Sequence, residues 1–169
     1  MADLPVPATG NGPRTISAPW DTPALRRHAR RLLESHRRWT GRDLLPLSSD
    51  DGENAARLAR APFVVVSHGT GADPVLDYGN DTALALWEMP WDDFVRTPSR
   101  FTAEAPDREE RARLLDQVTR HGFIADYTGI RVTRTGRRFR IAQATVWNLV
   151  GDDGAAAGQA ATFDRWQFL

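Results

Sequence analysis

Four histidines, His28, His36, His68 and His121, are the side chains of this sequence with the widest range of acid, base and metal chemistry. Their spacing does not predict a metal site, because neither His-x-x-His nor His-Glu-x-x-His occurs. His121 stands immediately before Gly122, the expected stop of a helix. A histidine at a helix C-terminus is stabilised by the helix dipole, so His121 has a structural explanation that needs no ligand.

Serine and acidic residues do not predict catalysis either. Ser67 and His68 are adjacent, but neighbours on a strand point to opposite faces of a sheet, so they cannot pair directly as nucleophile and base. The following Gly69-Thr70-Gly71 is a turn and not a phosphate loop, because no Gly-Lys-Ser/Thr follows it. Paired acids occupy expected helix starts or turns, at Asp92-Asp93, Glu109-Glu110 and Asp152-Asp153. We therefore expect a protein that is not an enzyme.

The composition narrows the chemistry further. Cysteine is absent, which excludes disulfides, thiolate nucleophiles, zinc–cysteine sites, iron–sulfur clusters and a cysteinyl–flavin adduct. The 22 basic residues, all of them arginine, balance 22 acidic residues, so no global field attracts nucleic acid or an anionic membrane. The exclusive use of arginine is typical of a GC-rich bacterial genome. Because no apolar h-region or bilayer-spanning run occurs, we expect a cytoplasmic protein with no membrane partner.

The N-terminal part predicts a tail and then an amphipathic helix. Residues 1–19 are rich in Pro, Gly, Ala and Thr and predict a flexible tail, after which Thr22-Pro23 predicts the start of a helix over 23–40. Its arginine face indicates a solvated surface rather than a nucleic-acid contact, because Glu34 interrupts it and no aromatic residues interleave. Its apolar stripe must be covered, either by the sheet of its own chain or by a second copy in a homodimer. The sequence leaves both alternatives open.

The remaining chain predicts an α+β domain. β-branched runs predict two strands, and a change from helical to two-residue period after Gly122 predicts three more. The expected strands are 63–67, 75–78, 127–134, 138–150 and 159–168, and the expected helices are 53–61, 80–87, 91–95 and 106–121. Two strands, a run of helices and a three-strand meander together predict a five-stranded antiparallel sheet with a helical connection on one face.

Polar residues within the 138–150 strand predict a ligand pocket. In strict alternation, Gln143 and Thr145 share one face with Phe139, Ile141, Trp147 and Leu149. If that face is inward, the two polar groups need partners, which a ligand, the backbone or each other could supply. Core packing is the favoured interpretation of each residue alone, and Asn80 is better placed as a helix cap than as a ligand contact. The pocket candidates as a set are Tyr78, Asn80, Trp87, Trp91, Phe94, Tyr127, Gln143, Thr145, Trp147 and Phe163.

The order of the elements resembles that of PAS domains. Tyr78-Gly79-Asn80 before an apolar helix resembles the PAS pattern of an aromatic residue followed by asparagine. The closer resemblance is to the MEKHLA domain, a PAS-like family that also occurs at the end of plant homeodomain–leucine-zipper factors, and it covers roughly residues 25–168. The motifs that carry it are Ser67-His68-Gly69, Gly122-Phe123-Ile124, residues 127–131, 136–139, 144–149 and 158–163.

The resemblance implies a PAS-like domain over residues 62–169, preceded by a helical segment over 20–61, in a bacterial stand-alone member. It supplies no established ligand, and DNA binding is not carried over because homeodomain and zipper are missing. In a haem-binding PAS domain the axial histidine lies on the helix before the meander, where His121 is the nearest candidate; the sequence requires neither haem nor flavin.

The expected function is a non-enzymatic sensory domain that binds a small hydrophobic or aromatic ligand or a protein partner. A dimerisation or protein-interaction module without ligand and a small enzyme are the alternatives.

Overall fold

The computed structural model describes residues 18–104 and 108–169. The predicted flexible tail at residues 1–19 therefore falls almost wholly outside the described residues, as does the expected start of the long helix near residue 106. Within the described ranges, no helix combines the length and the apolar character that crossing a bilayer takes.

The core of the fold is an antiparallel sheet in the strand order β2-β1-β5-β4-β3, with β6 paired to β4 beyond the end of β5. The strands are β1 (Val64–His68), β2 (Leu76–Gly79), β3 (Phe123–Val132), β4 (Arg138–Val150), β5 (Ala156–Phe163) and β6 (Arg165–Phe168). The expected last strand over 159–168 is divided at Asp164, but β5 and β6 continue the same register along β4. The predicted α+β architecture is confirmed, with five strands expected and six formed by the described residues.

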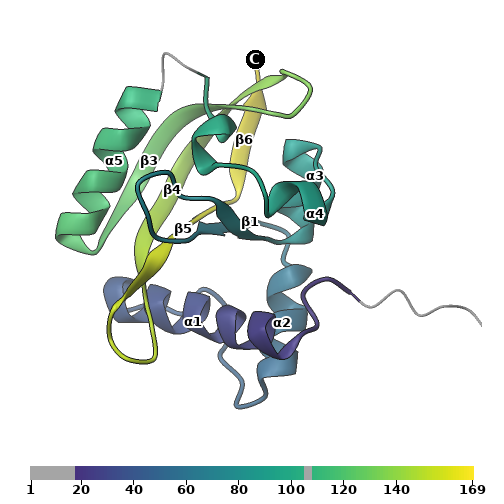
Figure 1. The fold of residues 1–169 in the computed structure, drawn as a ribbon, viewed down its shortest axis with the longest axis vertical. Coiled ribbons are helices and arrows are strands. Elements are labelled where there is room, and N and C mark those ends of the chain that lie inside the picture. Colours follow the sequence, from purple (N-terminus) through teal and green to yellow (C-terminus); the bar gives the residue numbers. More distant parts are fainter. Residues whose placement is uncertain (1–17, 105–107) are drawn as a thin grey trace, which may run out of the picture.

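The helices precede β1 or connect β2 to β3. They are α1 (Pro23–Thr40), α2 (Asp51–Ala59), α3 (Asp81–Trp87), α4 (Trp91–Phe94), the 3-10 helix η1 (Ser99–Thr102) and α5 (Arg108–His121). Figure 1 shows α1 and α2 together at one end of the molecule, while α3, α4 and α5 surround the other part of the sheet. We call the sheet face under α3, α4 and α5 the inner face, and the face under α1 the outer face.

The apolar stripe of α1 packs on the outer face of its own sheet. Ala29, Leu32 and Leu33 are buried in one cluster with residues such as Val65 and Trp147. The helix begins at Pro23 because the Thr22 side chain accepts a hydrogen bond from the Leu25 amide, and it ends where Gly41 takes a left-handed conformation. Of the two alternatives that the sequence left open for the stripe, the structure shows the intramolecular one.

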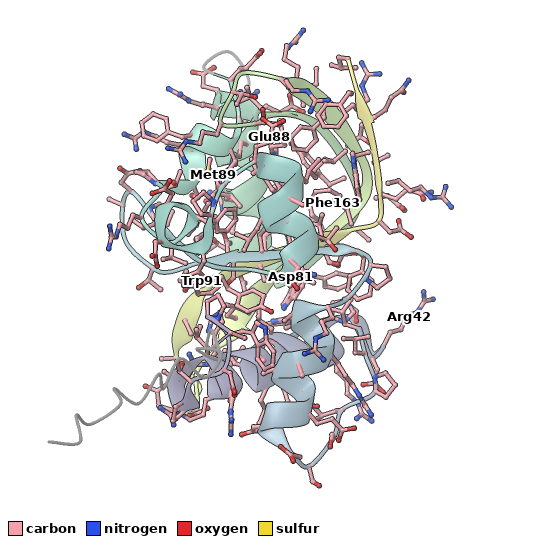
Figure 2. The ribbon with its side chains drawn as sticks, turned by 90° about the vertical axis from the view of Figure 1, so that its right-hand side faces the viewer. Arg42, Asp81, Glu88, Met89, Trp91 and Phe163 are labelled. Carbon is pink, nitrogen blue, oxygen red and sulfur yellow. The ribbon has the colours of Figure 1, made fainter. Side chains whose placement is uncertain are left out.

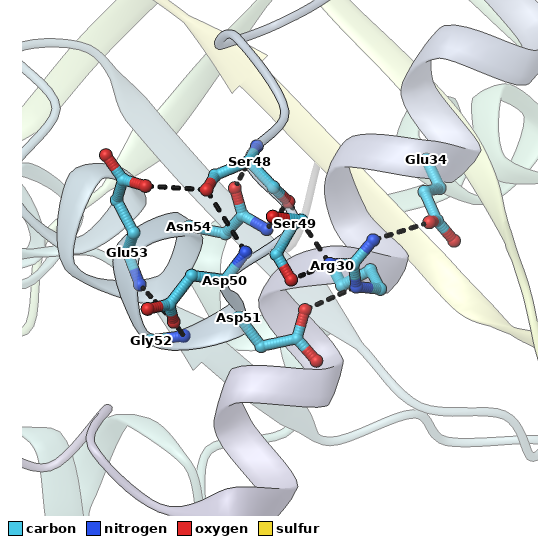
Figure 3. A network of polar contacts seen from close by, with 9 residues as sticks. All are labelled: Arg30, Glu34, Ser48, Ser49, Asp50, Asp51, Gly52, Glu53 and Asn54. Carbon is cyan, nitrogen blue, oxygen red and sulfur yellow. Dashed lines mark hydrogen bonds and ion pairs between the residues drawn. The ribbon is translucent and has the colours of Figure 1, made fainter.

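A network of polar contacts fixes α1 to α2 (Figure 3). The Arg30 guanidinium pairs with Asp51 and donates to the carbonyl oxygens of Ser48 and Ser49, at 3.1 and 3.2 Å. The Asn54 side chain closes the loop, because its amide donates to the Ser48 carbonyl and its oxygen accepts from the Ser48 amide. Arginines of the predicted solvated face are thus partly engaged by acids of their own chain.

A bulge in β4 reverses the alternation of its side chains. Gln143 has φ +54°, and the β3 register shows two β4 residues, 142 and 143, opposite the single residue 128. After this extra residue, Ala144 and Val146 continue the inner face begun by Ile141. The prediction that Gln143 and Thr145 share one face with Phe139, Ile141, Trp147 and Leu149 is therefore wrong.

Candidate functional site

A small cavity of about 60 Å³ lies between the inner face and the helices that cover it. Its walls are mostly apolar, because the inner-face residues of β1, β4 and β5 meet the buried sides of α3, α4 and α5 there. The apolar walls come mainly from Leu76, Trp87, Phe94, Leu114, Ile141, Ala144, Val146 and Phe163. A cavity of this size is dry or holds very few water molecules, since a water needs several polar partners.

Two arginines bring positive charge to this apolar cavity. Arg131 of β3 is only 7% exposed, and it donates to the Ile130 carbonyl at 2.9 Å and to the Tyr127 hydroxyl at 3.4 Å. Arg111 of α5 is half-buried and lines the same cavity. Burial, and then the neighbouring charge of Arg131, lower the pKa of Arg111 to about 10, so the Arg111 guanidinium is still cationic at neutral pH.

His68, at the end of β1, lines the cavity with a ring nitrogen that has no partner among the described residues. Its Nδ1 contacts the Gly69 carbonyl at 2.8 Å, whereas its buried Nε2 has no hydrogen-bond partner. Burial lowers the pKa of His68, and although the hydrogen bond to Gly69 opposes this effect, the charge of Arg111 adds to it. The neutral ring must donate from Nδ1 to the carbonyl, so Nε2 offers an unpaired acceptor.

A surface groove of about 870 Å³ adjoins the cavity. It runs between α5 and the loop at residues 69–74, and it shares His68, Arg111, Leu115 and Gln159 with the cavity wall. The Gln159 amide is held in place because it donates to the Leu115 carbonyl, at 3.0 Å, and to the Thr119 hydroxyl, also at 3.0 Å. The groove and the cavity therefore adjoin, with His68 and Arg111 at the junction.

The structure brings four of the ten predicted pocket residues to the cavity wall: Trp87, Phe94, Tyr127 and Phe163. Tyr78, Trp91 and Trp147 belong instead to the cluster that packs against α1. Gln143 is exposed in the β4 bulge, and Thr145 lies opposite Thr162 of β5. The remaining candidate, Asn80, does not line the cavity and has a structural role instead.

Asn80 joins three elements. Its side-chain oxygen accepts from the Val65 and Ala83 amides, both at 3.1 Å, while its amide donates to the carbonyl oxygens of Leu58 and Phe63. Asn80 is the N-cap of α3, as expected from the sequence. Figure 2 shows α3 above α2, with Asp81 at the end of α3 that is nearer to α2 and Glu88 at the end that is farther from it.

A hydrogen-bonded chain of His28, Ser67 and Asp77 lies on the outer face, and no local sequence motif predicts it. Ser67 Oγ donates to Asp77 at 2.5 Å and lies 2.9 Å from His28 Nε2. Because the single hydroxyl proton goes to Asp77, His28 Nε2 must be the donor to Ser67 and cannot act as its base. This arrangement connects α1 to β1 and β2 and does not resemble a nucleophile with its general base.

Haem and flavin do not fit this cavity. Ligand sites for molecules of drug size have roughly 300–1,000 Å³, several times the cavity volume here. His121, the nearest haem-ligand candidate from the sequence, is exposed at the end of α5 and does not line the cavity.

The sequence alone did not predict the polar residues of the site. His68, Arg111 and Arg131 come from a strand end, a helix and a second strand, so no local motif contains them. A weak sequence signal was present in Arg131, which lies between Ile130 and Val132, but its burial depends on the pairing of β3 with β4.

Comparisons with known proteins agree with this architecture. The model of the MEKHLA domain family matches residues 26–168. The homeobox-leucine zipper protein ATHB-14 of Arabidopsis thaliana is 25% identical over an alignment of 169 residues, which covers 96% of this chain and 20% of the plant protein. The chain thus spans about one fifth of that relative's length.

Two solved structures have the same fold. The PAS domain of a protein from Colwellia psychrerythraea superposes with a TM-score of 0.59 at 11% identity, over 69% of this chain and 94% of that one. The PAS domain of a LuxR-family transcriptional regulator from Burkholderia thailandensis, solved in complex with ethanol, has a TM-score of 0.50 at 22% identity, over 68% of this chain and 95% of that one. These matches confirm the PAS-like fold.

Proposed function

The chain belongs to the MEKHLA domain family and has the PAS-like fold of a sensory, non-enzymatic domain, and we propose that it senses a small molecule bound in the inner cavity. The observation that carries this proposal is the cavity itself, which has mostly apolar walls and adjoins a groove with polar groups at the junction. The PAS domain from Burkholderia thailandensis, solved with ethanol, supports a ligand of few atoms.

Contacts on the outer face provide a way for ligand binding to change the position of α1. Val146 lines the cavity, while the next residue, Trp147, packs its ring edge on His36 of α1 with the ring centroids 4.9 Å apart. The Trp39 indole and the Ser35 hydroxyl also bond to the backbone of β4, at 2.9 and 3.0 Å. A shift of β4 caused by a ligand on the inner face would therefore move α1.

A dimerisation module without ligand was the main alternative, and the unpaired stripe of α1 was the reason to consider it. That stripe is buried on the chain's own sheet, so this reason no longer applies. A protein partner remains compatible with the ligand proposal, because an α1 that moves with β4 presents a changed surface.

A variant whose side chain fills the cavity tests whether ligands bind there. Ala144 is fully buried in the cavity wall, and Ala144→Leu adds three carbon atoms there, whereas Ala142→Leu adds them at a half-buried site outside it. We would titrate both variants and the wild type with ethanol, propionate and lactate, and follow backbone amide signals by NMR. We expect shifts around the cavity in the wild type and in Ala142→Leu, and none in Ala144→Leu. Wild-type signals that no compound shifts, or shifts that survive in a folded Ala144→Leu, would refute the proposal.

A further inference from the structure

The polar groups at the junction of cavity and groove define a class of ligand, an inference that rests on the proposed function. We propose that the ligand is a small 2-hydroxycarboxylate, whose carboxylate binds Arg111 and Arg131 and whose hydroxyl donates to His68 Nε2. Three observations carry this proposal: the unbalanced charge of the two arginines, the direction of the hydrogen bond that His68 can make, and the size and character of the walls.

Within residues 18–104 and 108–169, the two arginines lack an anion. Among the described residues, neither Arg111 nor Arg131 forms an ion pair with a carboxylate, although surface arginines such as Arg100, Arg134 and Arg137 all do. Removing a cationic side chain from water costs free energy unless an opposite charge lies nearby, and two neighbouring cations increase this cost. A guanidinium donates two parallel hydrogen bonds to a carboxylate, so a carboxylate-bearing ligand satisfies this pair.

The unpaired Nε2 of His68 needs a hydrogen-bond donor, which the ligand would supply. Because Nδ1 donates to the Gly69 carbonyl, the neutral ring presents Nε2 as an acceptor, and that atom is buried without a partner. His68 as a whole is only 9% exposed, so bulk water does not supply the missing donor. A carboxylate alone has no proton to give, whereas a hydroxyl on the adjacent carbon has one.

The walls limit the size of the ligand and favour an organic one. The cavity volume of about 60 Å³ is far below the roughly 300–1,000 Å³ of sites for drug-sized molecules, so the part of the ligand inside it has only a few non-hydrogen atoms. Leu114, Ile141 and Phe94 line this space and contact a hydrocarbon group better than an inorganic ion. Lactate has a carboxylate, an adjacent hydroxyl and one methyl group, and is the simplest compound with all three features.

The experiment compares lactate with matched compounds by calorimetry and NMR at about pH 7.5, where a histidine of lowered pKa is neutral. Propionate lacks the hydroxyl, lactamide lacks the charge, and inorganic phosphate lacks the hydrocarbon group. We expect lactate to bind roughly tenfold or more tightly than each of the three. Equal binding of propionate overturns the role of His68, equal binding of lactamide overturns the role of the arginines, and equal binding of phosphate overturns the organic ligand.

The outcomes separate this inference from the proposed function. If ethanol shifts the amide signals of the cavity and lactate does not, the cavity binds ligands and the present inference fails. If none of ethanol, propionate and lactate shifts them, both fail.

Variants complete the test. Arg111→Met removes the half-buried charge, and Arg113→Met removes an exposed arginine of the same helix as the control. We expect lactate affinity to fall roughly tenfold or more in Arg111→Met and to stay unchanged in Arg113→Met. We also expect Arg111→Met without ligand to melt at or above the wild-type temperature, which shows that the loss of binding is not a loss of folding. A folded Arg111→Met that still binds lactate like the wild type would overturn the assignment.

Discussion

Gly158 allows β5 to pass the end of β1, and its replacement by alanine tests how tightly the site is built. Gly158 has φ +121°, a conformation that L residues rarely adopt. A Cβ at this position would lie 2.0 Å from the His68 carbonyl oxygen and 3.1 Å from the His68 carbonyl carbon. Both contacts are with backbone atoms, so a side-chain rotation cannot relieve them. Gly158→Ala must push β5 away from the strand end that carries His68.

The expected cost has two parts. Holding alanine at this φ costs about 1–3 kcal/mol. Displacing a packed backbone to make room for the methyl group costs about a further 1–3 kcal/mol. We therefore expect Gly158→Ala to lower the free energy of unfolding by about 4 kcal/mol, a large part of the usual stability of a domain.

Gly154 provides the matched control. It also has a positive φ, +79°, but a Cβ there would meet no atom within 4 Å, so Gly154→Ala contains only the backbone strain. Urea denaturation followed by tryptophan fluorescence gives the free energy of unfolding of both variants. We expect Gly158→Ala to lose at least about 1 kcal/mol more than Gly154→Ala. Equal losses would show that β1 and β5 do not approach as described, and the position of His68 would have to be reconsidered.

Three further predictions concern the elements around the site. Leu32→Ala should lower the free energy of unfolding by about 3 kcal/mol in urea denaturation, because Leu32 is fully buried between α1 and the sheet. Asn80→Ala should cost about 3 kcal/mol or more in the same assay, since it leaves buried backbone groups of three elements without partners; a loss under about 1 kcal/mol would contradict the junction role. Burial lowers the pKa of the histidines His28, His36 and His68, so below about pH 6.5 the unfolded chain binds protons that the folded chain does not. Stability should therefore be constant above that pH and decrease as the pH falls toward 5, by at most about 4 kcal/mol per pH unit; denaturation midpoints that do not change with pH would refute this.

The sequence predicted the fold well because its signals are local. Thr22-Pro23 and Gly41 delimit α1 in sequence and in structure, and the turn at Gly136 separates β3 from β4 as expected. Strand and helix order then restricts the topology to few choices. The boundary at Asp164 was missed because Asp164 lies opposite Gln143, the bulged residue of β4, a relation that depends on strand pairing.

The site was predicted only in part, for a specific physical reason. Strict alternation is a rule for a regular strand, and one extra residue at Gln143 exchanges the faces of all the β4 residues that follow. This exchange moved Trp147 from the predicted pocket to the α1 side and placed Val146 in the cavity wall instead. Gln143 is not a glycine, so no sequence signal marks the left-handed conformation it adopts.

The same bulge determines which β4 residues contact the cavity and which contact α1. Because consecutive residues of β4 face opposite ways, Val146 contacts the cavity while Trp147 contacts α1, and a displacement of one displaces the other. The charged junction at Arg111 lies on α5, whose Val118 packs on the inner face in the same cluster as Val146. An anion that draws Arg111 toward the cavity therefore acts on β4 through α5 as well as directly. A sensory role needs this kind of coupling, in which a small ligand on one face of a sheet changes the position of a helix on the other.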